Sequence, residues 1–361
     1  MLLIVKVGTS SVTTKMGSVD KQAIKKVSRE VARAHENGHK VVVVTSGAVT
    51  TGIAVLGMKE RPTDIETLQA LSSVGQHQLM SVYADNLAEC SLHAGQVLLT
   101  PLDFAIRSQY LHAKKTIERL LELSVVPIIN ENDAIADDEL RFGDNDRLAA
   151  LVANLLGGDM LLLLTDTEGL FDADPRLVAE ANLIDEIHAS DKNIDKAATG
   201  PVTSVGSGGM ASKLSAARIA AFSGILTVIA ASKRENVISD AIDGKKVGTK
   251  ILPNKKTLTA RQLWIAFAMK SRGRLLVDDG AKDALCNKDA SLLTIGVFDA
   301  VGDFEAEDAV EVCSGDGKVF AKGISRYGSK NAEEWMKKHS TDLPNGHSSI
   351  VIHRDDLVIL R

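Results

Sequence analysis

The sequence LLIVKVGTSS, residues 2–11, joins six largely apolar residues to a turn of small polar ones. A short, nearly continuous apolar run is typical of a strand that is covered on both faces, as the strands of a parallel sheet are. The chain repeats this pattern at residues 40–45, 95–99, 125–129, 160–165 and 226–230. We therefore expect these runs to form a mainly parallel sheet.

Longer amphipathic stretches separate the apolar runs. We predict a helix at each of them, at residues 21–37, 65–91, 110–124, 147–156 and 213–223. Strands that alternate with helices indicate an α/β fold. We expect a three-layer αβα sandwich, in which helices cover both faces of the sheet.

The pattern changes after Gly248. Residues 250–259 are polar and rich in lysine, and Pro253 and Asn254 mark a loop. Beyond it, Gly, Asp and Ser separate short β-like runs at residues 275–277, 292–294, 309–313, 319–324 and 350–352. Such runs predict a small, mostly β, barrel-like domain. We therefore divide the chain into a first domain at 1–255, a linker at 256–274 and a second domain at 275–361.

The composition disfavours several classes of protein. Of the 361 residues, 25% are charged and 4% are aromatic, and the net charge is −5. This balance argues against an extensive nonspecific grip on nucleic acid, and few aromatic side chains are present to stack on bases. The three cysteines are far apart, so their spacing predicts neither a zinc site nor a disulfide framework. No apolar run approaches the ~20 residues of a membrane helix, and the N-terminal run is too short for a signal peptide, so we expect a cytoplasmic protein.

Lys6 stands near the end of the first expected strand, two residues before Gly8. Open α/β sheets bind ligands at the carboxyl ends of their strands. A lysine there supplies a positive charge for a phosphate, and a glycine lets the backbone approach one closely. The alternative is a surface lysine after an edge strand, which the apolar neighbours disfavour. The spacing is not that of a P-loop.

Polar residues also follow other expected strands. Ser46 and Gly47 come directly after the run at 41–45, although a Ser-Gly pair is also a common turn from strand to helix. The sequence PIINEND, residues 127–133, ends in four consecutive polar residues. We expect these residues to lie at the ligand-binding edge of the sheet.

A second polar cluster, Asp144 to Asp146, precedes an apolar helix. One of its three residues is expected to cap the helix. Three polar residues exceed what capping needs. Together with the cluster at 130–133, they suit binding of an α-ammonium group and orientation of cationic catalytic residues.

Two later segments suit a nucleotide. MLLLLTD, residues 160–166, is an apolar strand that ends in Thr165 and Asp166. In SVGSGGMASK, residues 204–213, glycines precede a helix that we expect to begin near Met210. A glycine-rich helix N-terminus attracts anions, and Lys213 adds a positive charge. The alternative is a flexible linker before an amphipathic helix.

The order of these motifs resembles the amino acid kinase family. The motifs are Lys-x-Gly-Thr-Ser, Thr-Ser-Gly-Ala, Asn-Glu-Asn-Asp, Gly-Asp-Asn-Asp, Leu-Leu-Leu-Thr-Asp and Gly-Gly-Met-x-x-Lys. Each is short, but six in the right order are specific. The tail, from LLVDDGAKDAL at 275–285 to IHRDDLVIL at 352–360, resembles a PUA domain. The resemblance thus covers nearly the whole chain, and it is strongest to the members of the family that phosphorylate glutamate.

The resemblance implies that the protein transfers the γ-phosphoryl group of ATP to the side-chain carboxylate of L-glutamate. It implies that Lys6 and Lys213 bind phosphate, and that Asp146 holds the two lysines in place. The glutamate-binding positions match Ser46, Asp133 and Asn145, with Asn130 and Asp144 expected beside them. The ATP site is implied at Lys6, Gly8, Thr165, Asp166, Ser207, Gly208, Gly209, Met210, Ala211, Ser212 and Lys213.

The resemblance also implies partners. Mg²⁺ would accompany ATP and bridge its phosphates, and we assign it no ligand in the protein. Proline is expected as a feedback inhibitor, and a homodimer or homotetramer is expected as the assembly. RNA binding by the PUA-like tail is conceivable but has no support in the sequence.

Three other interpretations stay open. Another member of the family would phosphorylate aspartate, N-acetylglutamate or a nucleoside monophosphate, which the PUA-like tail disfavours. PUA domains also occur on proteins that bind or modify RNA, but the acidic charge balance speaks against that role. A catalytically inactive homologue is disfavoured because Lys6, Asp146 and Lys213 are all present.

Overall fold

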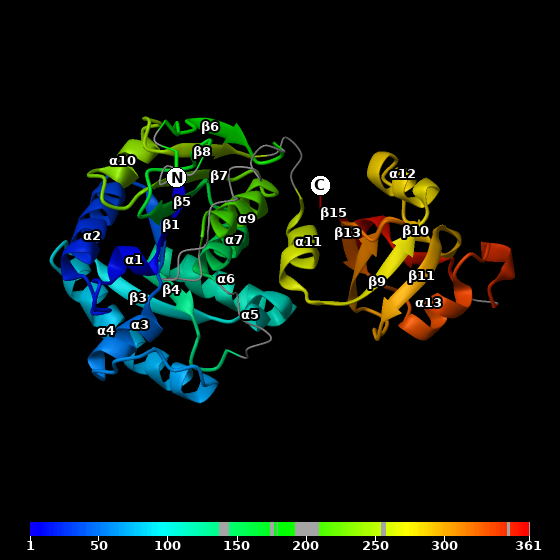
Figure 1. Ribbon diagram of the computed structural model, residues 1–361, viewed down its shortest axis with the longest axis horizontal. Helices are drawn as coiled ribbons and strands as arrows, with labels where there is room; N and C mark the ends of the chain where they lie inside the picture. Colours follow the sequence, from blue (N-terminus) through cyan, green and yellow to red (C-terminus); the bar gives the residue numbers. More distant parts are fainter. Residues whose placement is uncertain are drawn as a thin grey trace. The chain divides into compact units, whose positions relative to one another are not determined.

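The computed structural model describes residues 1–136, 144–173, 177–178, 180–191, 209–253, 258–344 and 347–360. The chain forms two compact units, Met1–Thr257 and Leu258–Arg361 (Figure 1). Among the described helices, none is long and apolar enough to cross a membrane.

The first unit is built on an eight-stranded sheet with the order β3-β4-β2-β1-β5-β7-β8-β6. Its strands are β1 (Leu2–Val7), β2 (Lys40–Val44), β3 (His93–Leu99), β4 (Val125–Glu131), β5 (Met160–Thr165), β6 (Glu186–His188), β7 (Leu226–Ala231) and β8 (Thr249–Leu252). Neighbouring strands are parallel except β7 and β8. This arrangement confirms the α/β class and the mainly parallel sheet. Strands β6 and β8, at one end of the sheet, were not predicted, because they are short and carry charged residues.

Helices cover both faces of this sheet. They are α1 (Thr9–Val12), α2 (Lys21–Glu36), α3 (Ala48–Val55), α4 (Ile65–Ala88), α5 (Pro101–Ala105), α6 (Arg107–Glu122), α7 (Asn145–Leu156), α9 (Met210–Ala221) and α10 (Val237–Ile242). The five predicted helices are all present. The short helices α1, α3, α5 and α10 were missed, since a few turns do not establish a helical period.

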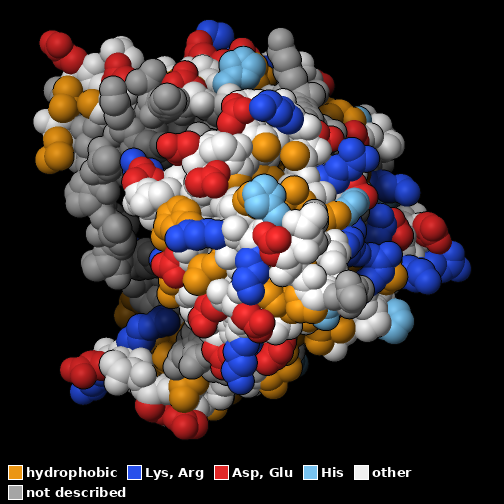
Figure 2. All heavy atoms as spheres, turned by 90° about the vertical axis from the view of Figure 1, so that its right-hand side faces the viewer, with side chains coloured by type: hydrophobic (Ala, Val, Ile, Leu, Met, Phe, Trp, Pro, Cys, Tyr) orange, Lys and Arg blue, Asp and Glu red, His pale blue; other side chains and the backbone are white. Residues whose placement is uncertain are grey.

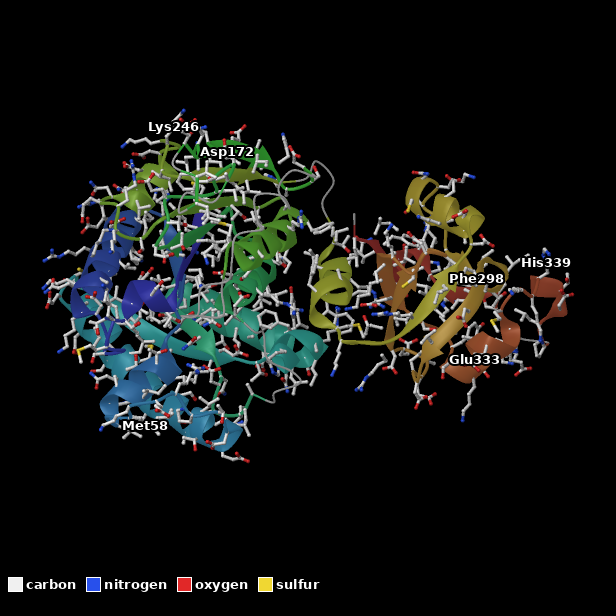
Figure 3. The ribbon with its side chains drawn as sticks, viewed as in Figure 1. Met58, Asp172, Lys246, Phe298, Glu333 and His339 are labelled. Atoms are coloured by element: carbon white, nitrogen blue, oxygen red, sulfur yellow. The ribbon has the colours of Figure 1, made fainter. Side chains whose placement is uncertain are left out.

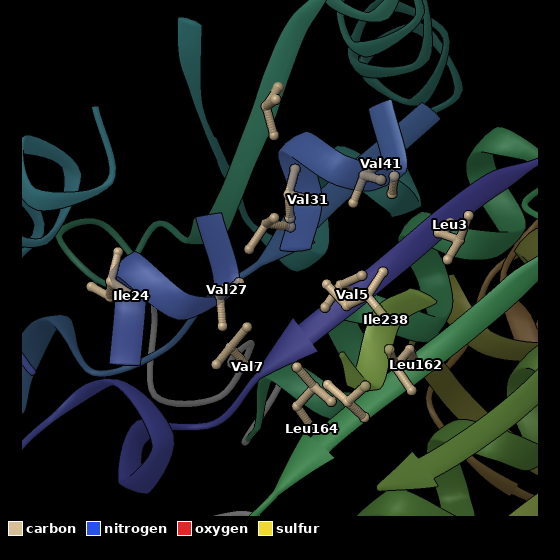
Figure 4. Packing of buried hydrophobic residues seen from close by; sticks show 14 of the residues in the cluster. Leu3, Val5, Val7, Ile24, Val27, Val31, Val41, Leu162, Leu164 and Ile238 are labelled. Carbon is tan, nitrogen blue, oxygen red and sulfur yellow. The ribbon is translucent and has the colours of Figure 1, made fainter. Parts of the chain in front are cut away.

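The alternation along β1 decides which layer each side chain joins. Leu3, Val5 and Val7 pack in one core with residues of α2, α4 and α10, such as Ile24 and Ile238 (Figure 4). Successive side chains of a strand point to opposite faces, so Ile4 and Lys6 lie on the other face. There β1 contacts α7. The sequence LLIVKV therefore places one lysine among apolar residues on the α7 side of the sheet.

The second unit contains a five-stranded sheet with the order β11-β9-β12-β13-β15 and a separate pair, β10 and β14. The strands are β9 (Ser271–Val277), β10 (Leu292–Leu293), β11 (Val297–Gly302), β12 (Ala309–Cys313), β13 (Val319–Ile324), β14 (Ile350–Ile352) and β15 (Leu357–Ile359). The helices are α11 (Ala260–Leu263), α12 (Asp279–Asn287) and α13 (Ser329–Trp335). Figure 3 locates Phe298 on β11 and Glu333 on α13. The face drawn in Figure 2 carries acidic, basic and histidine side chains among apolar ones.

The segment that we expected to be a linker, 256–274, has structure of its own in its described part. It contains α11, a π-helical turn (Trp264–Ala268) and the start of β9, all within the second unit. Ile265 and Ala266 are buried there against Ile324 and Val358. The apolar residues of this segment therefore fill a small core of their own, which explains why the segment is folded.

Candidate active site

The carboxyl ends of the central strands bring the predicted site residues to one edge of the sheet. Lys6 pairs in register with Val44 of β2 and with Leu163 of β5. The backbone N–H of Thr45 donates to the carbonyl of Ile129 at 2.8 Å. By this register, Asn130 of β4 lies one position beyond the level of Lys6. Ser46, after β2, and Thr165, the last residue of β5, lie two positions beyond it.

Asp146 lies between the two predicted phosphate-binding lysines. The Nζ atoms of Lys6 and Lys213 lie 2.6 and 3.0 Å from its two carboxylate oxygens. Asp146 is 0% exposed, and both lysines are buried. Burial alone would raise the pKa of Asp146, but the charges of the two lysines lower it below its ordinary value. The carboxylate is therefore ionised at neutral pH and holds two ammonium groups that are 207 positions apart in sequence.

The first turn of α7 explains how Asp146 is held. Asp144 is the N-cap, and its Oδ1 accepts from the backbone N–H groups of Asp146 and Arg147 at 2.8 and 3.0 Å. The hydroxyl oxygen of Ser212 lies 2.5 Å from Asp144 Oδ2 and 3.0 Å from Asp146 Oδ2. Ser212 thus connects α9 to α7. In this structure Asp144 caps the helix, and the contact with substrate that we expected of it stays a prediction.

Asn145 turns toward the neighbouring strands. Its Nδ2 donates to the carbonyl oxygen of Thr45 and to Oδ1 of Asn130, each at 2.6 Å. Asn130 is buried and belongs to β4. The two asparagines expected to bind substrate are thus bonded to one another.

A cavity of about 280 Å³ opens beside this pair, between α4 and the ends of β3 and β4. Asp133, one of the predicted residues, contributes to its wall. The wall is formed by Ala48, Ser72, Ser73, Gln76, His77, Gln96, Leu98, Glu131, Asn132, Asp133 and Ala134.

Gln76 and Gln96 are among the wall residues that were not predicted. Gln76 is 7% exposed and shares a helical face with Ser72, Leu79 and Tyr83, which are also buried. A large polar side chain at a core-facing position is the signal that could have identified it.

Glycines place α3 and α4 against each other. A Cβ atom at Gly75 would lie 1.8 Å from the carbonyl oxygen of Ala48, and one at Gly52 would lie 2.0 Å from that of Leu71. The two backbones are therefore in direct contact. Gly47, the N-cap of α3, has φ of +100°, a conformation that other residues rarely adopt. This turn carries the chain from β2 past Ser46 into α3.

The expected nucleotide side lies at the ends of β5 and β7. The Oγ1 of Thr165 donates to Asp166 Oδ1 at 3.1 Å. The backbone carbonyl of Thr165 accepts from the N–H of Ser232 at 2.7 Å. Gly209 is the N-cap of α9, which begins with Met210, Ala211 and Ser212. Ser207 and Gly208 lie outside the described residues.

A Cβ atom at Gly8 would lie 3.6 Å from Lys6 Nζ, an ordinary van der Waals distance, so this glycine lies directly beside that ammonium group. The arrangement as a whole offers two cations, a helix N-terminus and an adjacent cavity with carboxylates in its wall. Such a set of groups can neutralise phosphate oxygens on one side and bind a cationic group on the other.

Comparison with known proteins agrees with the two families that the motifs and the tail resemble. The model of the amino acid kinase family matches residues 1–231, and the model of the PUA domain matches residues 273–346. A glutamate 5-kinase from Nitrosomonas eutropha is 43% identical over 99% of this chain and 97% of its own length. The glutamate 5-kinase of Thermoanaerobacter sp. (strain X514) is 41% identical over 100% of this chain and 98% of its own length.

The glutamate 5-kinase of Aliivibrio salmonicida is likewise 41% identical, over 99% of this chain and 98% of its own length. The predicted family and the PUA tail are thereby confirmed. The fold of the chain, its motifs and these matches show that it belongs to the amino acid kinase family.

Proposed function

We infer that this protein phosphorylates the side-chain carboxylate of L-glutamate with ATP. The product would be L-glutamyl 5-phosphate, the first intermediate of proline biosynthesis. Relatives named glutamate 5-kinase match nearly the whole chain at about the same identity. The observation that carries the proposal is the buried cluster of Lys6, Asp146 and Lys213 beside a cavity at the carboxyl edge of the sheet.

The reaction needs positioning and charge neutralisation more than proton transfer. A carboxylate oxygen attacks the γ-phosphorus of ATP, a new O–P bond forms, and the bond to the bridging oxygen breaks as ADP leaves. The attacking carboxylate is already ionised at pH 7, so no general base is required. The ammonium groups of Lys6 and Lys213 would neutralise the charge on the transferred group. Asp146 would fix the distance between them.

The acceptor would lie between the lysines and the cavity. We assign Ser46, Asn130, Asp133 and Asn145 to acceptor binding. Ser46 follows β2, Asn130 lies at the end of β4, Asp133 follows it, and Asn145 begins α7. The carboxylate of Asp133 suits the α-ammonium group of an amino acid.

The nucleotide would lie across the ends of β5 and β7 and the start of α9. We assign Gly8, Thr165, Asp166 and residues 207–213 to it. Mg²⁺ usually keeps several waters and is held through substrate phosphates with one or two carboxylates. In the described part of the chain, no group of three or more possible metal ligands occurs. Mg²⁺ would reach the site with ATP, as part of the co-substrate.

The test is ADP release with L-glutamate, L-aspartate, N-acetyl-L-glutamate and a nucleoside monophosphate as acceptors. Addition of hydroxylamine traps an acyl phosphate as a hydroxamate, which distinguishes a carboxylate acceptor from a phosphate acceptor. We expect the largest kcat/KM and hydroxamate formation with L-glutamate. ADP release that does not depend on glutamate, or that is faster with another acceptor, would contradict the proposal.

Inhibition by proline, a dimeric or tetrameric assembly and a cytoplasmic location accompany this proposal as predictions. Proline added to the same assay would check the first, and light scattering would check the second. Salt-dependent binding of structured RNA to the full chain would favour the RNA-binding alternative instead.

A further inference from the structure

A chain of four side-chain amides runs from the catalytic edge into the cavity. It begins at Asn145 of α7, whose Nδ2 donates to Asn130 Oδ1 of β4 at 2.6 Å. Asn130 Nδ2 donates to Gln76 Oε1 of α4 at 2.7 Å. Gln76 Nε2 then donates to Gln96 Oε1 of β3 at 3.3 Å. Four separate elements of the first unit thus share one line of hydrogen bonds.

Backbone groups fix the direction of this line. Asn145 Nδ2 also donates to the carbonyl oxygen of Thr45 at 2.6 Å, and Asn130 Oδ1 also accepts from the N–H of Glu131 at 3.0 Å. A carbonyl can only accept and a backbone N–H can only donate, so neither asparagine can be rotated without losing a bond. Because Asn130 can only donate from Nδ2 toward α4, Gln76 must accept this bond with Oε1.

The consequence is that Gln76 turns its nitrogen away from Asn130. Nε2 of Gln76 carries two hydrogens, and Gln96 is its one acceptor among the described residues, at the long distance of 3.3 Å. Gln76 also forms part of the cavity wall. The second N–H can therefore donate to a bound molecule. This N–H is held in place by a line of bonds that begins at the carbonyl of Thr45, after β2, and at the N–H of Glu131 in β4.

The position of the cavity indicates which part of the acceptor it receives. In the sheet, β4 is separated from β1 by β2. Adjacent strands are about 4.8 Å apart, so the end of β4 lies about 10 Å from β1 and Lys6. The reacting carboxylate has to lie at the lysines. The cavity is then left for the opposite end of the acceptor, where an amino acid carries an α-ammonium and an α-carboxylate.

We propose that Gln76 binds the α-carboxylate of the acceptor through Nε2, and so selects acceptors that carry this carboxylate over those that lack it. This proposal rests on the function inferred above. The carboxylates of Glu131 and Asp133 in the same wall suit the ammonium group, whereas an N–H donor suits the carboxylate. A hydrogen bond to an ionised group contributes enough to change kcat/KM about tenfold to a hundredfold.

The experiment compares acceptors that lack one group at a time. In 4-aminobutyrate the α-carboxylate of glutamate is absent, and in glutarate the α-ammonium is absent. We expect Gln76→Met to lower kcat/KM for L-glutamate and for glutarate about tenfold to a hundredfold more than kcat/KM for 4-aminobutyrate, and to leave KM for ATP unchanged. Gln76→Glu should lower the value for glutamate further, because it places a carboxylate against a carboxylate. For acceptors that turn over slowly, the inhibition constant against glutamate replaces kcat/KM.

Asn86→Leu is the matched control. Asn86 is another buried amide of α4, it donates to Val82 O at 2.7 Å, and it is absent from the cavity wall. Asn86→Leu should change kcat/KM by the same factor for all acceptors or leave it unchanged. An equal loss for glutamate and 4-aminobutyrate in Gln76→Met, or no loss for glutamate, would overturn the role of Gln76 while glutamate-dependent ADP release stands. An enzyme without that release would refute the proposed function itself, and the role of Gln76 with it.

Discussion

Two buried carboxylates of the first unit, Asp146 and Glu30, are both paired with lysine, yet they lie in different surroundings. Asp146 lies between two lysines at the carboxyl edge of the sheet. Glu30 lies in α2 and is 4% exposed. One of its oxygens accepts from Lys26 at 2.7 Å and the other from the backbone N–H of Ile238 at 2.8 Å.

The two sites differ in what surrounds the lysine. Lys26 also donates to the carbonyl oxygen of Ser232 at 3.0 Å, so it connects α2 to the segment between β7 and α10. Lys6, by contrast, lies next to Gly8 at the carboxyl edge of the parallel strands. A buried ion pair therefore indicates a ligand site only at the carboxyl edge of the parallel sheet, where such folds bind ligands. Elsewhere it is a cross-link between elements.

The largest expected effect separates these two kinds of lysine. Lys6→Ala and Lys213→Ala should each lower kcat about a hundredfold to a thousandfold, because each removes a charge from the transition state. Lys26→Ala is the control, since it also removes a lysine paired with a buried carboxylate. Circular dichroism should show all three variants folded. A fall in kcat of the same size for Lys26→Ala would break the distinction.

A smaller effect is expected on stability at the cross-link. Glu30→Gln keeps the shape of the side chain but removes its charge, so Lys26 loses its ionic partner. Lys26 is partly exposed, so we expect a loss of about 1–3 kcal/mol in the free energy of unfolding, with kcat close to that of the parent protein. Urea denaturation measures the first quantity and the ADP assay the second. A large fall in kcat with unchanged stability would assign Glu30 to the active site.

The pH dependence of stability sharpens the description of Asp146. Its pKa is lowered in the folded protein, so its contribution is complete above the unfolded value of about 4 and is lost as the pH falls through the folded value. The difference in unfolding free energy between the parent protein and Asp146→Asn should be constant from pH 7 to 5. It should shrink below pH 4. A difference that grows on acidification would mean that the aspartate is protonated in the fold.

The smallest expected effect concerns Ser212, which contacts Asp144 and Asp146 but neither lysine in the described bonds. Ser212→Ala removes one hydroxyl from a carboxylate that two lysines still hold. We expect kcat to fall about twofold to tenfold, the range of a single hydrogen bond. A fall in kcat as large as that of Lys213→Ala would show that Ser212 acts on the transferred phosphoryl group, beyond holding Asp146 and lining the nucleotide site.

The sequence allowed the sheet to be predicted better than the contacts across it. Continuous apolar runs such as LLIVKV identified β1 to β5 and β7, because strands that are buried on both faces tolerate few polar residues. Lys6 was noticed because it interrupts such a run. The short helix α3 was missed, since AVTTGIAV mixes β-branched residues and glycine over only two turns.

The amide chain was not predictable in the same way. Gln76 lies 54 positions from Asn130 and 20 from Gln96, and no local pattern relates them. Its one local sign was a polar residue on the buried face of α4. The direction of its hydrogen bonds depends on backbone groups of β2 and β4, which become neighbours only in the folded sheet.

The glycine contact between α3 and α4 limits how the substrate range of this protein can be redesigned. Where backbone touches backbone at Gly52 and Gly75, no side chain remains to be trimmed or exchanged. The distance between these helices is therefore fixed, and with it the width of the cavity on that side. Room for a longer acceptor has to come from shortening larger wall residues, such as His77 of α4 and Leu98 of β3.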